Sequence, residues 1–310
     1  MAMILVTGGA GFIGSHLAVA LLDSGHDVRV VDNLSTGLRA NVPAGAEFIE
    51  GDLTDPATAA AAAAGCEVVL HQAAVASVPL SISEPRISHD ANINSTFNVL
   101  MAARDAGVRR VVFAASSAVY GNSPELPKVE DMPADPCSPY ALQKLVGESY
   151  CQLFTQLYGL ETVATRYFNV FGPRQHPSSP YSGVLSLFIR AALSGQAATM
   201  YGDGEQTRDF TYIDDVVDAV TRAMVAPDAS GQVINVATGS SVSLNEAWAT
   251  LGRILGPLPA PSYGPPREGD VRHSRADIGK AERLLGYTSR VSFETGLRHT
   301  VEWARRAGAT

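Results

Sequence analysis

The sequence has little cysteine and no long apolar run. Its three cysteines, Cys66, Cys137 and Cys151, are widely spaced and form no CxxC or paired Cys/His motif. We therefore expect reduced structural thiols in a cytoplasmic protein, and no zinc site. No apolar stretch approaches the roughly 18 residues that predict a membrane span. The N-terminal segment enters an expected strand at Met3-Ile-Leu-Val6 without the basic region of a targeting signal.

Positive charge is also scarce. The chain has 23 Lys and Arg against 31 Asp and Glu, a formal net charge of −8. Binding to nucleic acid phosphates needs a basic surface, so DNA and RNA are not expected as partners. A hydrophobic content of 46% with 17% charged residues is typical of a soluble, well-packed protein. The 310 residues suffice for one large domain or two closely joined ones.

Short, mostly apolar runs alternate with longer helical segments in the first half. The expected strands are Met3–Thr7, Asp27–Asp32, Glu47–Glu50, Val68–His71, Arg110–Ala115 and Thr162–Tyr167. The expected helices are Ile13–Ser24, Pro56–Ala64, Ser88–Ala106 and Tyr140–Tyr158. This alternation predicts an α/β fold with a doubly wound parallel sheet, its strands buried on both faces.

The composition changes after about Tyr167, where Gly, Pro and Ser become frequent. Such a composition favours a smaller, loop-rich lobe that contacts the first one. Phe210–Val225 and Gln232–Val236 still have the patterns of a helix and a strand, and we expect them to return to the main sheet.

A glycine-rich loop follows the first expected strand. Gly8-Gly-Ala-Gly11-Phe-Ile-Gly14 opens a helix, and glycines let the backbone turn tightly and approach a pyrophosphate at the helix N-terminus. Asp32, at the end of the second strand, is placed to accept hydrogen bonds from the adenosine ribose diol. Its charge would repel a 2′-phosphate. The pattern therefore predicts bound NAD rather than NADP; a ligand-free strand–helix turn is the alternative.

Tyr140 and Lys144 lie four residues apart in a segment that begins Ser138-Pro-Tyr. Serine is a favoured helix N-cap and proline is favoured in the first turn. Residues at this spacing share one helical face. A free tyrosine has a pKa of about 10, and a neighbouring ammonium favours its phenolate. The pair indicates a tuned acid/base, with a solvated helix face as the alternative.

Ser116 comes just past the apolar strand Val111–Ala115. Ligands of doubly wound sheets bind beyond the carboxyl ends of the strands, and a hydroxyl there can both donate to and accept from a reacting alcohol. Ser117 is the rival for this role; we expect it to contact substrate or backbone. A serine pair that merely caps the strand end is the remaining alternative.

Taken together, these motifs resemble the extended short-chain dehydrogenase/reductase superfamily. Within it the chain is similar to the UDP-glucose/UDP-N-acetylglucosamine 4-epimerases. The motifs that carry the resemblance are the glycine loop, Asp32–Gly37, Gly51–Leu53, His71–Ala74, Ser116–Gly121, Tyr140–Lys144, Arg166–Asn169, Tyr201–Phe210 and Arg267–Asp270.

The resemblance implies a Rossmann domain of residues 1–168 and 209–237, and a nucleotide-sugar-binding α/β domain of residues 169–208 and 238–310. It also implies a homodimer, in which Ser88–Ala106 and Tyr140–Tyr158 pair with their copies in a four-helix bundle. Burial of both helices against the chain's own sheet is the alternative.

For the cofactor, the resemblance implies catalysis by Ser116, Tyr140 and Lys144 beside bound NAD. The residues expected to contact NAD are Gly8, Gly11, Phe12, Ile13, Gly14, Asp32, Asn33, Ser35, Thr36, Gly37, Asp52, Leu53, Gln72, Ala73, Ala74, Asn92, Ser116, Tyr140, Lys144 and Tyr167. Asp52 could instead cap a helix, and Asn92 could simply be exposed. His71 is expected to end a strand beside the cofactor, not to act as a base.

For the substrate, the resemblance implies a UDP-sugar with its diphosphate on an amide and two arginines. The expected contacts are Ser117, Asn169, Val184, Phe188, Tyr201, Arg208, Arg267, Asp270 and Ser274. Asn169, Arg208 and Arg267 would bind the diphosphate, and Asp270 the ribose. Val184, Phe188 and Tyr201 would enclose uracil. A small residue at Ser274 leaves room for an N-acetylated sugar. Without the resemblance, Arg208 and Asp209 would be read as a surface ion pair.

The implied reaction is transient oxidation at C4 of the sugar, with Tyr140 taking the hydroxyl proton. Nucleotide-sugar 4,6-dehydratases carry an Asp-Glu pair after the active hydroxyl residue; Ser117 and Ala118 stand there in this chain, and Ala118 cannot transfer a proton. UDP-glucuronate 4-epimerases tend to have Thr and a later Arg where this chain has Asn169 and His176. The missing arginine weakens the case for a C6 carboxylate, but His176 could partly replace it, so UDP-glucuronate stays an alternative substrate. A non-catalytic NAD-bound scaffold is a further alternative.

Overall fold

A seven-stranded parallel sheet forms the centre of the larger lobe in the computed structural model, which describes residues 2–175, 183–266 and 271–308. The strand order is β11-β6-β5-β4-β1-β2-β3. The strands are β1 (Met3–Thr7), β2 (Asp27–Asp32), β3 (Glu47–Glu50), β4 (Val68–His71), β5 (Arg110–Ser116), β6 (Glu161–Tyr167) and β11 (Gln232–Val236). The order reverses between β1 and β4, the point at which such sheets bind ligands. The predicted doubly wound α/β class is confirmed.

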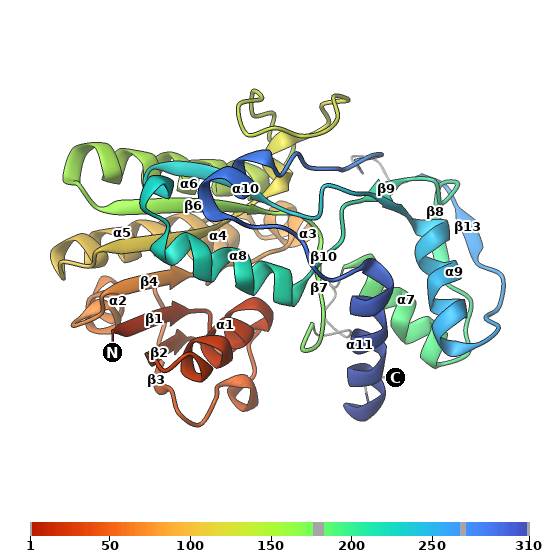
Figure 1. Ribbon diagram of the computed structural model, residues 1–310, viewed down its shortest axis with the longest axis horizontal. Helices are drawn as coiled ribbons and strands as arrows, with labels where there is room; N and C mark the ends of the chain where they lie inside the picture. Colours follow the sequence, from red (N-terminus) through yellow and green to blue (C-terminus); the bar gives the residue numbers. More distant parts are fainter. Residues whose placement is uncertain (1, 176–182, 267–270, 309–310) are drawn as a thin grey trace.

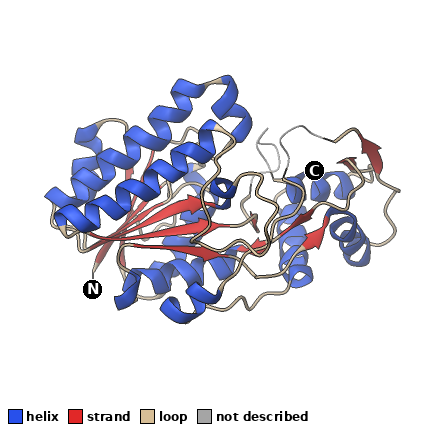
Figure 2. Ribbon diagram, turned by 90° about the horizontal axis from the view of Figure 1, so that it is seen from above, coloured by secondary structure: helices blue, strands red, loops and turns tan. Residues whose placement is uncertain are grey.

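Helices cover both faces of this sheet (Figure 2). One layer contains α1 (Phe12–Asp23), α8 (Ile213–Val225) and α10 (Gly279–Leu285); the other contains α2 (Pro56–Ala63), α5 (Ser95–Asp105) and α6 (Pro139–Tyr158). Alternate residues of each strand pack against the two helix layers. In β1, Ile4 and Val6 belong to the hydrophobic cluster with α1 and α8, whereas Leu5 belongs to the cluster with α2 and α5. Burial on both faces explains why the strands are continuously apolar.

A smaller lobe lies beyond the carboxyl ends of the sheet (Figure 1). Its helices are α7 (Val184–Leu193), α9 (Leu244–Leu255) and α11 (Phe293–Arg306). Its short strand pairs are β8 (Thr199–Tyr201) with β13 (Ser262–Gly264) and β9 (Thr207–Arg208) with β12 (Val242–Ser243). Between the lobes β7 (Val170–Phe171) pairs with β10 (Thr211–Tyr212). One hydrophobic cluster joins Val6 of β1 to Trp248 of α9, so the lobes share a core.

The segment predicted as one helix from Ser88 to Ala106 has a more complex form. It begins in α4 (Pro85–His89), passes through a π-helical turn at Asp90–Asn94, and continues as α5; the short α3 (Val78–Ser83) precedes it. Such π turns often occur at functional sites. The prediction that Gln232–Val236 rejoins the main sheet is confirmed, because β11 pairs in parallel with β6.

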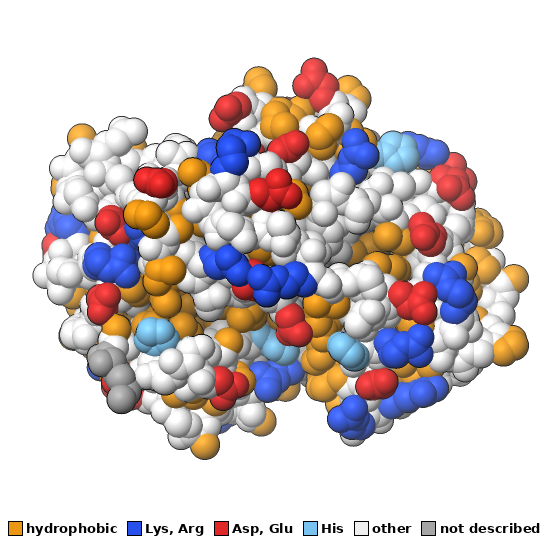
Figure 3. All heavy atoms as spheres, in the orientation of Figure 1, with side chains coloured by type: hydrophobic (Ala, Val, Ile, Leu, Met, Phe, Trp, Pro, Cys, Tyr) orange, Lys and Arg blue, Asp and Glu red, His pale blue; other side chains and the backbone are white. Residues whose placement is uncertain are grey.

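The remaining short elements are 3₁₀ turns at Arg39–Asn41, Ser117–Tyr120 and Pro227–Ala229. No helix in the described part of the chain is long and apolar enough to cross a membrane. Among the same residues, no group of three or more His, Cys, Asp or Glu side chains could hold a metal ion. On the face seen in Figure 3, acidic and basic side chains are interspersed with uncharged ones.

Candidate active site

The glycine loop turns tightly between β1 and α1. Gly8 has a φ of +65°, and a Cβ added there would lie 2.8 Å from the Cα of Ala73. A Cβ on Gly14 would lie 2.3 Å from the Gly8 carbonyl oxygen. Helix α1 starts at Phe12 with no side-chain cap, so its first N–H groups remain available to an anion. This cradle fits the pyrophosphate of a dinucleotide.

Asp32 faces the same loop from the end of β2. One carboxylate oxygen accepts a hydrogen bond from the Ala10 N–H at 3.0 Å, and the other accepts from the Leu34 N–H at 2.8 Å. Each oxygen keeps a further lone pair for a ligand hydroxyl. The position therefore suits a ribose diol and disfavours a 2′-phosphate, as NAD binding requires.

Asp52 lies beside Asn33, whose amide donates to it at 3.0 Å. The alternative that Asp52 caps the next helix is wrong, because Asp55 accepts the N–H groups of Ala57 and Thr58 and so caps α2. The Asn33–Asp52 pair thus stays at the sheet edge next to Asp32.

Gln72 and Tyr167 meet across the carboxyl ends of β4 and β6. The Tyr167 hydroxyl donates to Gln72 Oε1 at 3.0 Å. Gln72 Nε2 is buried and has no hydrogen-bond partner within the described chain. Because an unsatisfied buried donor is costly, this amide fits a ligand with acceptor groups. The rest of the expected NAD contacts lie at the start of α1 and just after β2, β3 and β4: Phe12, Ile13, Ser35, Thr36, Gly37, Leu53, Ala73 and Ala74.

Helix α6 begins as predicted, with the Ser138 hydroxyl accepting from the Ala141 N–H at 3.2 Å. Tyr140 stands half-buried in its first turn. Lys144 is only 4% exposed; its ammonium donates to the Ala114 carbonyl at 2.7 Å and lies 6.0 Å from the centre of the Tyr140 ring. Ser116 ends β5. The structure thus brings the three predicted catalytic residues to one place, at the carboxyl edge of the sheet.

Burial dominates the electrostatics of this group. It raises the pKa of Tyr140, an effect that a hydrogen bond with Ser116 partly offsets. The sequence-based expectation of a lowered pKa for Tyr140 is therefore wrong for this arrangement of side chains. Burial lowers the pKa of Lys144 to about 8, against the opposing charge of Glu148. The lysine can therefore change charge near neutral pH.

Asn92 lies in the π turn and is 3% exposed, so the alternative of an exposed residue is wrong. Its side chain accepts from the Val75 N–H at 2.8 Å and donates to Gln143 Oε1 at 2.7 Å. Gln143 precedes Lys144 on α6 and also accepts from Ser88 at 2.7 Å. Sequence reasoning missed Gln143, because a buried glutamine has no local signature.

His71 is buried at the end of β4 between two threonines. Its Nδ1 bonds the Thr7 hydroxyl at 2.7 Å and its Nε2 bonds the Thr96 hydroxyl at 3.0 Å. Burial, aided by the charge of Lys144, lowers the pKa of His71 to about 3. Both nitrogens of this neutral imidazole are therefore engaged inside the protein.

The expected substrate residues lie around β6, α7, β8 and β9. Asn169 follows β6 with a φ of 22°, and Val184 begins α7. Tyr201 ends β8 and is 37% exposed. Phe188 differs from these, since it is 3% exposed and packs edge-to-face on Trp248 in the core.

Arg208 ends β9, next to Ser274, whose N–H donates to the Thr207 carbonyl at 3.1 Å. The alternative ion pair between Arg208 and Asp209 is not formed by these two described residues. Asp209 is fully buried, and both of its carboxylate oxygens accept hydrogen bonds, from Thr238, Gly239 and Ala276.

Ser117 opens the 3₁₀ turn after β5. His176, Arg267 and Asp270 lie outside the described residues.

Comparison with known proteins connects this geometry to one family. A sequence model of the NAD dependent epimerase/dehydratase family matches residues 4–237. The UDP-glucose 4-epimerase of Mycolicibacterium smegmatis is 41% identical, over 97% of this chain and 98% of that protein.

Two solved structures superimpose closely. The UDP-glucose 4-epimerase of Thermotoga maritima with UDP-glucose gives a TM-score of 0.95 at 39% identity, covering 98% of this chain and 99% of that one. The UDP-N-acetylglucosamine 4-epimerase of Methanobrevibacter ruminantium, in complex with UDP-N-acetylmuramic acid, gives 0.94 at 39% identity, covering 99% of both chains.

Proposed function

The chain belongs to the NAD-dependent epimerase/dehydratase family, and from this membership we propose that it is a UDP-hexose 4-epimerase. It interconverts UDP-glucose and UDP-galactose by transient oxidation at C4 of the sugar, with NAD as its cofactor. The observation that carries the proposal is that the hydroxyls of Ser116, at the end of β5, and Tyr140, in the first turn of α6, come together beside Lys144, whose ammonium lies 6.0 Å from the centre of the Tyr140 ring. These two hydroxyls lie at the sheet edge where the glycine loop and Asp32 fit a dinucleotide.

NAD would be held by the first turn of α1, by Asp32 and by Gln72. When bound, it supplies an oxidised nicotinamide ring whose positive charge favours a nearby phenolate and which accepts and returns the C4 hydrogen as hydride. The protein supplies position and proton transfer.

The proton chemistry is assigned to Tyr140, which takes the proton of the sugar 4-hydroxyl and later returns it to the same oxygen. The Ser116 hydroxyl, beside Tyr140, can both donate to and accept from that oxygen. Lys144, one helical turn along α6, places a positive charge that favours the phenolate. Because the proton returns to the atom it left, no further acid or base is needed.

The sugar specificity extends, in this proposal, to N-acetylated hexoses. Ser274 is small and lies beside β9, next to the expected diphosphate residue Arg208. The similarity to a UDP-N-acetylglucosamine 4-epimerase supports this breadth. Turnover of UDP-galactose and UDP-N-acetylgalactosamine should be compared; complete inactivity on the second would contradict it.

Two other reactions have less support. A 4,6-dehydratase needs an acid beside the active hydroxyl, but the neighbour there is Ala118, whose N–H donates to Ser116 Oγ at 3.2 Å. A UDP-glucuronate 4-epimerase would use His176 in place of an arginine at the C6 carboxylate of the sugar. Among the residues that the structure describes, none favours this reaction. A panel of UDP-sugars incubated with the purified protein, with products separated by stereochemistry, distinguishes these reactions.

We also propose the domain division 1–168 with 209–237 and 169–208 with 238–310, and a cytoplasmic homodimer. Large apolar side chains on α5 and α6 are exposed, with Phe97 39%, Leu153 46% and Leu157 68% accessible. Pairing of these helices with a second copy would bury them. Light scattering should give twice the monomer mass, and a monomer at micromolar concentration would contradict the pairing.

A further inference from the structure

A buried ion pair lies directly behind the predicted catalytic residues. Arg166 of β6 binds Glu148 of α6 through two parallel hydrogen bonds, Nε to Oε1 at 2.9 Å and Nη2 to Oε2 at 2.8 Å. The two side chains are 6% and 3% exposed. A buried pair of this kind rarely adds stability over apolar residues, so its presence needs another reason.

Glu148 stands four residues after Lys144 on α6, and Lys144 stands four residues after Tyr140. All three therefore share one face of the helix. Tyr140 reaches the sheet edge, Lys144 is held against the Ala114 carbonyl, and Glu148 is fixed by Arg166. The lysine ammonium lies 6.0 Å from the centre of the Tyr140 ring, and the charge of Glu148, one helical turn further along α6, acts on it.

The other groups near this row come from β4, from α6 itself, from the 3₁₀ turn at Ser117–Tyr120 and from the loop that contains Glu130. On β4, His71 is neutral within its pair of threonines. On α6 itself, Cys151 is buried and its pKa is raised by that burial. Behind the ion pair, Tyr120 lies under the Arg166 guanidinium at 4.7 Å, and the Glu130 carbonyl accepts from Arg166 at 3.2 Å.

A polar cleft of about 330 Å³ reaches the ion pair from the outer surface, and its lining includes the charged residues Glu130, Asp131 and Lys280. Of these groups, the Glu130 carboxylate accepts from the Asn235 N–H at 2.8 Å, and none of the three contributes to the pKa shift of Lys144. Glu148 is thus the carboxylate acting on Lys144 among the described residues, and the one whose charge opposes the effect of burial on the lysine.

We propose that Glu148, held by Arg166, is a positioning residue that keeps Lys144 protonated next to Tyr140. The inference rests on the proposed role of Lys144 in catalysis. The buried pair then contributes to the reaction through the charge of Lys144. Burial alone drives the lysine toward its neutral form, and a neutral amine could no longer favour the Tyr140 phenolate. The carboxylate restores the ammonium, and the arginine limits how strongly it does so.

The composition of the chain permits a direct test, because it contains three lysines, Lys128, Lys144 and Lys280. Protein labelled with ¹³C-lysine should give three side-chain Cε signals, which can be titrated in the full-length protein with its NAD. In Glu148→Gln the pKa of Lys144 should fall. For unit charges about 6 Å apart at an effective dielectric constant of about 20, the expected shift is about two pKa units.

Arg166→Gln should move the same signal the opposite way, since Glu148 would then interact with Lys144 alone. If the ion pair were purely structural, the two variants would not shift the Lys144 pKa in opposite directions. The pH above which kcat falls should shift with the Lys144 pKa, to lower pH in Glu148→Gln and to higher pH in Arg166→Gln. Should Glu148→Gln fail to fold, Glu148→Asp should give a smaller fall in the same direction.

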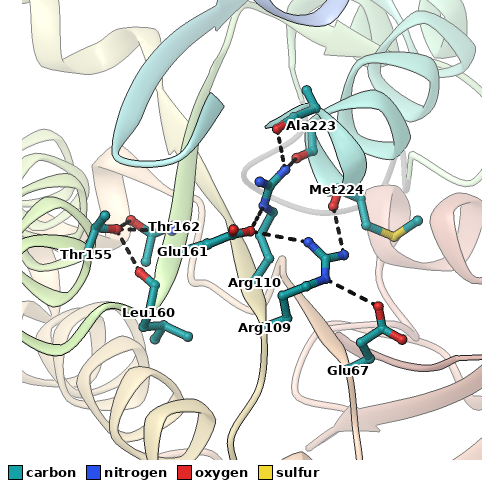
Figure 4. Close-up of polar contacts among 10 residues, drawn as sticks. Glu67, Arg109, Arg110, Thr155, Leu160, Glu161, Thr162, Ala223 and Met224 are labelled. Atoms are coloured by element: carbon teal, nitrogen blue, oxygen red, sulfur yellow. Dashed lines mark hydrogen bonds and ion pairs between the residues drawn. The ribbon is translucent and has the colours of Figure 1, made fainter. Parts of the chain in front are cut away.

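Glu161→Gln is the matched control. Glu161 binds the buried Arg110 at 2.8 Å at the amino ends of β5 and β6 (Figure 4). Lys144 binds the Ala114 carbonyl, toward the opposite end of β5. The Glu161→Gln substitution thus also removes a carboxylate from a buried arginine, but it should leave the Lys144 titration unchanged.

An unchanged Lys144 pKa in folded Glu148→Gln or Glu148→Asp, or shifts of one sign in Glu148→Gln and Arg166→Gln, would overturn the inference. The NMR titration needs no turnover. If the wild-type protein epimerises no UDP-hexose, the proposed function fails while the titration still decides the role of the pair.

Discussion

Replacing Gly14 by alanine should loosen NAD binding by forcing apart the turn that cradles it. The new Cβ would lie 2.3 Å from the Gly8 carbonyl oxygen and 2.8 Å from the Gly9 Cα. Carbon contacts are favourable at about 3.5–4.0 Å, so the loop must open by about 1 Å. Both neighbours are backbone atoms and cannot rotate away. Overpacking of this size costs about 1–3 kcal/mol, which outweighs the gain of about 1 kcal/mol from alanine in a helix.

Gly252 provides the matched control, since it lies within α9 and an added Cβ there would meet no atom within 4 Å. Gly252→Ala should therefore stabilise the protein by about 0.5–1 kcal/mol and leave NAD content unchanged. Thermal unfolding and the NAD released from denatured protein measure both effects. A Gly14→Ala protein with wild-type NAD content and melting temperature would refute the reasoning about the cradle.

Two further predictions concern buried and charged groups at the cofactor edge. His71 has a folded-state pKa of about 3, below its unfolded value. The unfolded state therefore binds the extra proton, and the stability of the protein falls as pH drops from about 6.5 toward 3. His71→Gln should remove up to about 1.4 kcal/mol per pH unit of that dependence, measured by urea unfolding, and an identical pH dependence in both proteins would contradict the prediction. Asp32→Ser should weaken NAD binding and improve NADP binding, because the carboxylate no longer repels a 2′-phosphate; calorimetric titration with both dinucleotides tests this, and an unchanged preference for NAD would contradict it.

The local patterns of this chain were sufficient for the sheet and its glycine loop. Strands buried on both faces are apolar throughout, and the Ser138-Pro-Tyr start of α6 is a capping signal that depends on few distant contacts. The π turn at Asp90–Asn94 could not be predicted in this way. It is associated with Asn92, whose partners Val75 and Gln143 come from other parts of the chain.

The pKa of Tyr140 was misjudged for a related reason. Spacing on a helix places Lys144 near the tyrosine, but it carries no information on burial, which has the larger effect here. The same limit applies to Glu148. A glutamate on a helix is usually a solvated residue, and only the position of β6 reveals that Arg166 holds it inside the protein.

The central claim is that the hydrogen at C4 of the sugar leaves and returns within one closed site. UDP-galactose carrying deuterium at C4, incubated with the enzyme in ordinary water, tests it most directly. We predict UDP-glucose of unchanged mass with the deuterium still on C4, and a loss of turnover of at least about 100-fold in Tyr140→Phe. Protium at C4, or a product lighter by one water, would contradict the account.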